Sequence, residues 1–249
     1  MAIKFLFKIF VLSIFSTHLF AAGLDLRNVV QQENLVMPLP ELVDGDLNLS
    51  GLFRLQDMML PKEVQGNLYL SGLYEANVLF FPDKLKGSIY AESMVLATDL
   101  VLPKVMSGGI YFDRLEKIND LEFPMIVSKD INLDSLIEAK TIIFPKVVGG
   151  ELNLRQMKSM KGIILPNKVA GDLFLTSLEE TNYLIFPEEV GGNLYIESLP
   201  NLDLVHLPKK IGGDIFIRKM NSIPPEKLPL DFGGQVFVLR MPRFNMTDL

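Results

Sequence analysis

Two sets of acidic residues recur along the chain at intervals of 21 residues. One set is Asp130, Glu151 and Asp172, and the other is Glu92, Asp113 and Asp134. If 21 residues make one turn of a stacked structure, the members of a set lie about 5 Å apart, which is close to the carboxyl separation of a retaining glycosidase. Such a row could also collect a calcium ion. A solvated acidic face explains both sets more simply, so we expect no enzymatic activity and rank a carbohydrate-active enzyme last.

The residues of most other catalytic and metal chemistries are missing. The chain has no cysteine, and His206 is its only histidine apart from His18 in the N-terminal apolar segment. These counts exclude disulfides, cysteine nucleophiles and metal sites built on histidine or cysteine. Nothing around His206 indicates a Ser-His-Asp site. We therefore expect no cofactor and no metal.

A row of prolines divides the chain into equal units. Ten prolines follow one another at intervals of 21 residues without insertion or deletion: Pro40, Pro61, Pro82, Pro103, Pro124, Pro145, Pro166, Pro187, Pro208 and Pro229. A fixed period of this length is typical of repeat architectures, and an unbroken register indicates one body. We therefore predict a single domain of ten repeats over residues 40–249.

Within each repeat, counted from its proline, apolar residues stand at positions 3, 7, 9 and 12. The alternation at 7 and 9 predicts a half-buried strand. A second short apolar run, such as Leu79-Phe80-Phe81, precedes each proline and ends there because proline has no N–H to donate. Each coil should therefore hold two short strands and two bends, stacked in parallel sheets with little helix. Glycine recurs at position 5 in every coil except one, where Lys129 replaces it. A recurring glycine predicts positive φ or close backbone approach at this position.

The residues before the first repeat predict export. Lys4 and Lys8 precede an apolar run over residues 9–15, and small residues at 21–23 suit cleavage, so residues 1–22 are a predicted signal peptide. Residues 23–39 are a predicted N-terminal cap, because the end of a solenoid needs a cover. We expect a periplasmic, cell-surface or secreted protein, and the lack of disulfides favours a bacterial source.

The charge limits the partners. The formal net charge is −6, and removal of residues 1–22 with their two lysines and no acid leaves 22 basic and 30 acidic residues, or −8. An acidic chain is a poor match for a phosphate backbone, so nucleic acid is not an expected partner. Contact with a membrane is expected only through the signal segment.

The repeat unit resembles a known superfamily. Residues 144–154 read Phe-Pro-Lys-Val-Val-Gly-Gly-Glu-Leu-Asn-Leu, and residues 207–217 repeat the pattern. This unit is similar to the leucine-rich-repeat superfamily, in particular to bacterial LPxxVGGxLxL repeats and the related receptor L-domains. The resemblance implies an all-β, right-handed parallel solenoid that binds proteins or glycans. The chain departs from the general pattern at position 12, where Leu or Met replaces Asn or Cys, so we expect a flatter solenoid than the curved horseshoe.

The candidate binding residues stand at position 8. If positions 7 and 9 point inward, position 8 points outward. The row is rich in aromatic residues, which anchor partner proteins or sugar rings, although stacked aromatics could also simply stabilise neighbouring strands. We select the following candidates for contact with a protein or glycan ligand: Tyr69, Tyr90, Tyr111, Asn132, Asn153, Phe174, Tyr195 and Phe216.

A second surface offers an alternative function. The residue two places before most prolines is apolar, as in Phe80, Val101, Ile143, Ile164 and Ile185. If these side chains face outward, they form an apolar row of the kind that marks an interface. We prefer the other interpretation, in which a neighbouring loop covers the row or its side chains point inward. Exposed edges or this row could make the protein a self-associating structural or surface element.

Overall fold

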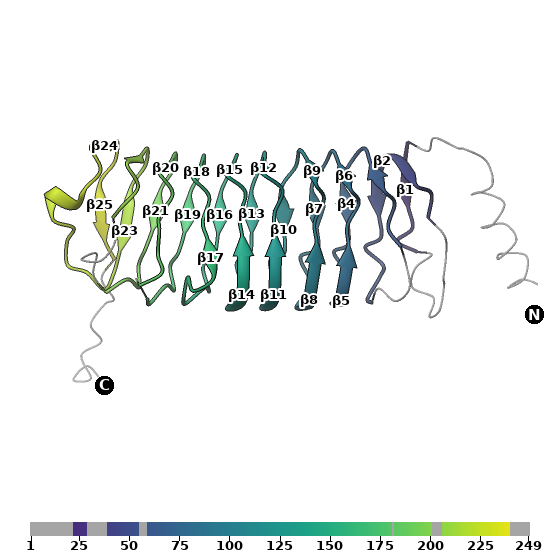
Figure 1. Cartoon of the computed structure of the whole chain (residues 1–249), viewed down its shortest axis with the longest axis horizontal. Helices are drawn as coiled ribbons and strands as arrows, with labels where there is room; N and C mark the ends of the chain where they lie inside the picture. Colours follow the sequence, from purple (N-terminus) through teal and green to yellow (C-terminus); the bar gives the residue numbers. More distant parts are fainter. Residues whose placement is uncertain (1–21, 29–38, 55–58, 181, 201–205, 240–249) are drawn as a thin grey trace, which may run out of the picture.

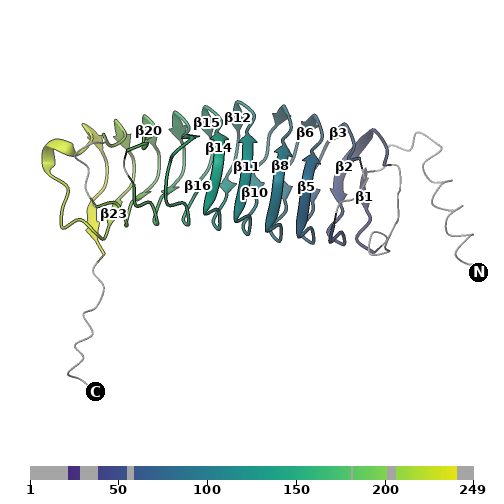
Figure 2. The ribbon, with the colours of Figure 1, turned by 60° about the horizontal axis from the view of Figure 1, so that its bottom comes forward.

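The computed structural model describes residues 22–28, 39–54, 59–180, 182–200 and 206–239. Within them the chain forms an elongated parallel β-solenoid of about nine turns (Figure 1). Coils related by 21 residues lie side by side along its axis (Figure 2). The predicted all-β solenoid of 21-residue coils with little helix is therefore confirmed. The predicted signal peptide lies outside the described residues, apart from Ala22.

Three sheets run along the solenoid. Sheet A uses positions 7 and 8 of each coil, whose apolar first residue faces inward. Its strands are β1 (Ala22–Asp25), β2 (Leu42–Asn48), β4 (Leu68–Tyr69), β7 (Ile89–Tyr90), β10 (Ile110–Tyr111), β13 (Ile131–Asn132), β16 (Leu152–Asn153), β19 (Leu173–Phe174), β21 (Leu194–Tyr195), β23 (Ile215–Ile217) and β25 (Val236–Val238).

Sheet B uses positions 2 and 3, between the proline and the glycine of each coil. Its strands are β3 (Glu63–Val64), β6 (Lys84–Leu85), β9 (Val105–Met106), β12 (Ile126–Val127), β15 (Val147–Val148), β18 (Lys168–Val169), β20 (Glu189–Val190), β22 (Lys210–Ile211) and β24 (Asp231–Phe232). Strand β2 joins β3, β6 and β9 to sheet A, while β12 to β24 form a separate group. Sheet B is thus divided between β9 and β12.

Sheet C lies on the run before each proline. Its strands are β5 (Glu75–Phe80), β8 (Leu96–Val101), β11 (Lys117–Glu122), β14 (Glu138–Ile143) and β17 (Ile163–Ile164). The described helical structure is one short 3₁₀ turn, η1 (Pro225–Lys227). The prediction of two strands per coil was incomplete, because the apolar residue at position 3 pairs with its neighbours as a third strand.

The core consists of the predicted apolar positions. Residues at positions 3, 7, 9 and 12 are buried in the central coils and form one continuous cluster, as Val127, Ile131, Leu133 and Leu136 of one coil illustrate. A column of identical environments explains the tolerance for Leu, Ile, Val or Met at a given position, since each side chain packs on its equivalents one coil away.

The predicted N-terminal cap, residues 23–39, is only partly described. Residues 22–25 form β1, which pairs in parallel with β2, and Leu26 is buried against the core. This segment therefore extends sheet A by one strand beyond the first repeat. Residues 29–38 lie outside the described part of the chain.

Candidate functional site

The outward surface of sheet A is flanked by a ladder of polar side chains at position 6. In seven coils the side-chain oxygen accepts a hydrogen bond from the backbone N–H of the same position in the next coil, at 2.7–3.0 Å. The acceptors of this polar ladder are Asp46, Asn67, Ser88, Asp130, Asp172, Asn193 and Asp214. Asp130 and Asp172, two of the three position-6 acids that were considered for catalysis, thus accept hydrogen bonds from backbone amides.

Close approach of the preceding coil, through its backbone and through the polar ladder, explains the glycine at position 5. A Cβ at Gly150 or Gly192 would overlap the carboxylate oxygen of the position-6 aspartate in the preceding coil. Positive φ is not the reason, because within this column only Gly45 has it, at 128°. Glycine is therefore required for close approach.

Lys129 replaces this glycine at the one coil where the preceding position 6 is itself a glycine, Gly109. No side-chain oxygen then projects toward the Lys129 Cβ. The same coil carries the division of sheet B between β9 and β12. Lys129 is therefore accommodated in two ways: Gly109 has no side chain that would overlap its Cβ, and the strands of sheet B are unpaired between β9 and β12.

The aromatic residues at position 8 form two stacks along sheet A. Tyr69, Tyr90 and Tyr111 stack with ring centroids 5.0 Å apart. The second stack, with centroid distances of 4.4–5.2 Å, consists of Phe174, Tyr195, Phe216 and Phe237. We call the two stacks together the aromatic ladder.

The position-8 row is therefore mostly half-buried. Each ring covers the face of the next, so that solvent reaches mainly the ring edges. Asn153 and Phe174 are buried, at 8% exposure each. Among the candidates, Tyr69, Tyr90, Tyr111, Asn132, Tyr195 and Phe216 are half-buried. The ring contacts support the role of these aromatics in strand stacking.

Hydrogen bonds hold the edges of the tyrosine rings. The Asn67 and Asn193 amides donate to the hydroxyls of Tyr69 and Tyr195, at 3.1 and 3.4 Å. Tyr111 has Gly109 at position 6 of its own coil, and its hydroxyl instead donates to Asp130 Oδ2 of the next coil, at 3.1 Å. Burial and the Asp130 carboxylate raise the pKa of Tyr111 to about 12, so the phenol keeps its proton.

The aromatic ladder is interrupted at Asn132 and Asn153. The guanidinium of Arg155 lies 4.1 Å from the ring centroid of Phe174. Since Tyr195 covers the opposite face of that ring, Arg155 occupies the layer of Asn153. Asp134 fixes the guanidinium through a 3.1 Å ion pair.

The acids at position 10 form a second row beside the aromatic ladder. Burial, followed by the neighbouring Glu92 and Asp134 carboxylates, raises the pKa of Asp113. Buried Glu92 Oε2 and Asp113 Oδ1 have no hydrogen-bond partner among the described residues. Burial, Asp172 and Asp130 likewise raise the pKa of Glu151. Within the described ranges, no three acidic or histidine side chains are arranged to hold a metal ion.

The apolar row of sheet C faces outward. We define it as Met59, Phe80, Val101, Ile143, Ile164 and Ile185, whose exposure ranges from 41% to 86%. The preferred interpretation from the sequence, that this row is covered or points inward, is wrong for the described chain. The side chains between them, such as Leu79 and Leu100, fill the core instead, because successive residues of a strand point to opposite faces.

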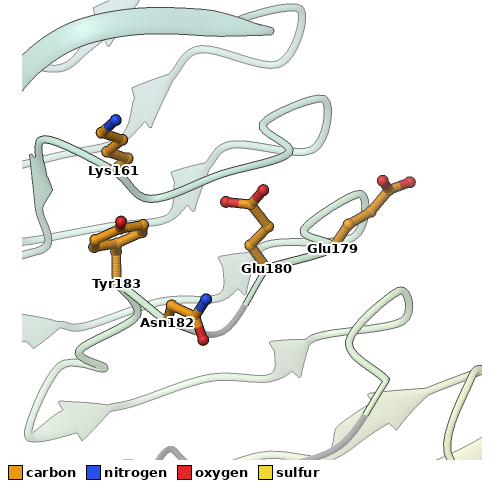
Figure 3. Close-up of a pocket in the computed structure, with 5 residues that line it drawn as sticks. All are labelled: Lys161, Glu179, Glu180, Asn182 and Tyr183. Atoms are coloured by element: carbon orange, nitrogen blue, oxygen red, sulfur yellow. The ribbon is translucent and has the colours of Figure 1, made fainter.

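A polar pocket of about 460 Å³ lies where sheet C ends, beyond β17 (Figure 3). It is lined by Lys161, Glu179, Glu180, Asn182 and Tyr183, and Glu180 accepts a hydrogen bond from Ser159 at 2.7 Å. The sequence analysis missed this pocket. The sequence signal that could have indicated it is Thr181, a polar residue in a column where the earlier coils carry Ala76, Ala97, Ile118, Ala139 and Met160.

No protein-family model, no curated protein and no solved structure matches this chain. Over the part of the chain that is described, no helix has the length and apolar character needed to cross a membrane.

Proposed function

We propose that this protein is a non-enzymatic binding protein that presents the apolar row of sheet C to a partner protein. The observation that carries the proposal is the exposure of that row on a regular sheet. Large apolar side chains in a contiguous exposed row are typical of interaction sites. The central strands β8, β11 and β14 are each fixed by parallel pairing on both sides, so binding there costs little ordering of the backbone.

The regular part of this surface is small. The six-residue strands β5, β8, β11 and β14 span about 19 Å along the solenoid at 4.8 Å per coil, and their length adds about 20 Å of width. The resulting area of about 400 Å², which Met59, Ile164 and Ile185 extend along the row, suits a small or transient interface rather than the roughly 800 Å² that each partner buries in a standard one. Asp120 and Thr141 lie between the row and the other edge of the strands, which gives the surface a polar border.

Glu122 favours a different protein over a second copy of this chain. Glu122 pairs with Val101 on one side and Ile143 on the other, so it lies in the middle of sheet C. Symmetric face-to-face pairing of two copies about the centre of that sheet would place Glu122 against Glu122. Like charges in an interface are costly, whereas a basic residue of another protein would pair with Glu122.

The proposal also includes export of the protein and its relation to leucine-rich repeats. The basic and apolar N-terminal segment supports export to the periplasm, cell surface or medium. The repeat motif supports a relation to leucine-rich repeats of the bacterial type, whose members bind proteins or glycans. A mature chain of net charge −8 would favour a partner with a basic border around its apolar centre.

The proposal is tested by comparing Ile164→Asp with Ile126→Asp. Ile164 lies in the apolar row and is 65% exposed, while Ile126 lies on sheet B and is 57% exposed. In pull-downs from extracts of the source cells, proteins retained by the wild type and by Ile126→Asp should be lost with Ile164→Asp. Retention that is independent of Ile164 would refute the proposal.

Light scattering over a concentration series gives the second arm of the test. The proposal predicts a monomer throughout for the purified chain. A dimer that dissociates with Ile164→Asp would instead assign the row to self-association, which is the alternative that the sequence raised.

A further inference from the structure

The interruption of the aromatic ladder leaves one layer unfilled. Tyr90 stacks on one face of Tyr111, and the other face points toward the coil of Asn132. Two coils separate Tyr111 from Phe174, and Arg155 fills the layer nearer to Phe174. The layer above Asn132 remains, and we call it the ladder gap. Its height is one coil step, the step at which Tyr90 and Tyr111 stack at 5.0 Å.

The side chain of Asn132 does not fill the ladder gap. Its Oδ1 accepts a hydrogen bond from the backbone N–H of Asp134 at 3.0 Å, which holds the short amide against its own strand end. Asn153 makes the same bond but is buried, since Arg155 lies in its layer, whereas Asn132 is half-buried. The two asparagines thus differ in what covers them.

Polar groups of both kinds surround the ladder gap. Asp130 and Asp134, half-buried on the same coil, provide carboxylate acceptors, and each carboxylate oxygen can accept two hydrogen bonds. The Nδ2 of Asn132 and the guanidinium of Arg155 are donors. One wall is therefore the face of Tyr111, the other is a guanidinium plane, and acceptors stand beside donors at the rim.

We propose that the ladder gap binds one neutral pyranose ring of a glycan. The C–H face of the sugar lies on the Tyr111 ring, and its hydroxyls donate to Asp130 and Asp134 and accept from Asn132. A hydroxyl both donates and accepts, so a sugar matches this alternation at several points. This site goes beyond the proposed function, because it lies on sheet A and not on the surface offered to a partner protein.

Other ligand classes fit less well. An anionic sugar meets the carboxylates of Asp113, Asp130 and Asp134, which outnumber the guanidinium of Arg155. A cation such as a partner arginine would lie directly against the Arg155 guanidinium. An aromatic side chain of a protein could stack, but it brings at most one hydroxyl or N–H and leaves the remaining polar groups unmatched.

The test uses maltotriose and cellotriose as neutral probes and trigalacturonate as the anionic comparison. Saturation-transfer NMR should show contact with at least one neutral probe and none with trigalacturonate, and calorimetry should give its affinity. Absence of binding by both neutral probes, or equal binding of trigalacturonate, overturns the proposal. Neither outcome bears on the apolar row of sheet C.

Two variants locate the binding. Asn132→Tyr fills the ladder gap with a ring that this position carries in four other coils, and it should abolish binding. Asn48→Tyr, which adds a ring at the N-terminal end of the ladder, should leave the affinity unchanged. Tyr111→Leu retains an apolar side chain without the flat face and should weaken binding about tenfold. Unchanged affinity in Asn132→Tyr, with the fold intact by circular dichroism, would disprove the site.

Discussion

The residue at position 6 of one coil limits which residue can stand at position 5 of the next coil. A polar side chain at position 6 reaches the next backbone N–H, and the next position 5 must then lack a Cβ. The hydrogen bond to the backbone stabilises by about 1 kcal/mol net and satisfies an amide that the strands leave unpaired. Glycine at position 5 therefore accommodates both the polar side chain of the preceding position 6, as at Gly192, and the backbone of the preceding coil, as at Gly108 and Gly171.

This coupling can be measured with Gly192→Ala and Asp172→Gly. Gly192→Ala alone should destabilise the protein by about 1–3 kcal/mol, because the new methyl overlaps Asp172. In the Asp172→Gly background the same change should cost less, by about 0.5–3 kcal/mol. Urea unfolding of the four proteins gives the cycle. Additive effects would show that the carboxylate does not set the requirement for glycine.

A second residue-scale prediction concerns Asp113 and pH. Its folded-state pKa lies above the ordinary value of 3.8, so the folded protein binds the proton more tightly than the unfolded chain. Stability is therefore lost as pH rises from 3.8 through the folded-state pKa. Asp113→Asn should raise the Tm at neutral pH, and the gain should vanish below pH 3.8. Exposed Asp83→Asn is the control. A gain for Asp113→Asn that is independent of pH would contradict the argument.

The sequence indicated some of these residue roles and not others. The buried columns followed directly from the period, because every coil repeats them. The role of Asp130 did not, since a carboxylate that binds a backbone amide and one that faces water look alike in sequence. The meaning of Lys129 required knowledge of which atoms approach across the coil boundary.

At the scale of the element, the aromatic ladder stabilises sheet A. From β4 onward its strands are only two or three residues long, so backbone pairing within each is limited. Stacked rings add cross-strand contacts at every step, and aromatic pairs contribute about 0.5–1.5 kcal/mol beyond their burial. The ladder therefore contributes to stability wherever it is continuous.

Tyr195→Ala and Phe237→Ala test this contribution. Tyr195 stacks on Phe174 and Phe216, whereas Phe237, the last ring of the described ladder, stacks on Phe216. Tyr195→Ala should therefore cost about 3–5 kcal/mol and Phe237→Ala clearly less. Guanidinium unfolding measures both. Equal costs would mean that ring stacking contributes little beyond burial.

The elements were predictable where the pattern was long and less so where it was short. The apolar run before each proline indicated the strands of sheet C, but their buried residues, such as Ala76 and Leu79, lie three positions apart and show no simple alternation. Sheet B strands have two residues, too few for a period to be visible. The residues at position 8 of sheet A could be located from the repeat, but their burial depends on ring contacts between coils that lie 21 residues apart.

At the scale of the whole molecule, stability arises between neighbouring coils. Every described strand pairing in sheets A to C joins adjacent coils, including the pairings of β2 with β3 and β4. Such a chain behaves as a linear array in which each coil depends on the two beside it. Removing one complete coil should then shorten the array without changing its register.

Deletion of residues 62–82 tests this expectation against deletion of residues 62–81. The first removes one period and places Gly87 after Asp46, which is a compatible pair. It should retain one cooperative unfolding transition. The second leaves one residue too many, turns apolar side chains outward in that coil, and should lose several kcal/mol more. Circular dichroism during urea unfolding distinguishes them, and equal stability of the two would contradict a fixed register.

The pairing of Gly109 with Lys129 has a consequence for how such a protein can grow. Tandem duplication of most coils gives a daughter whose glycine follows a polar side chain, as it does in the parent. Duplication of residues 125–145 would place a second Lys129 immediately after Asp130, where its Cβ overlaps the carboxylate. The coil that contains Lys129 can therefore be duplicated only together with the coil before it. The unit of duplication is 42 residues here and 21 residues elsewhere in the solenoid.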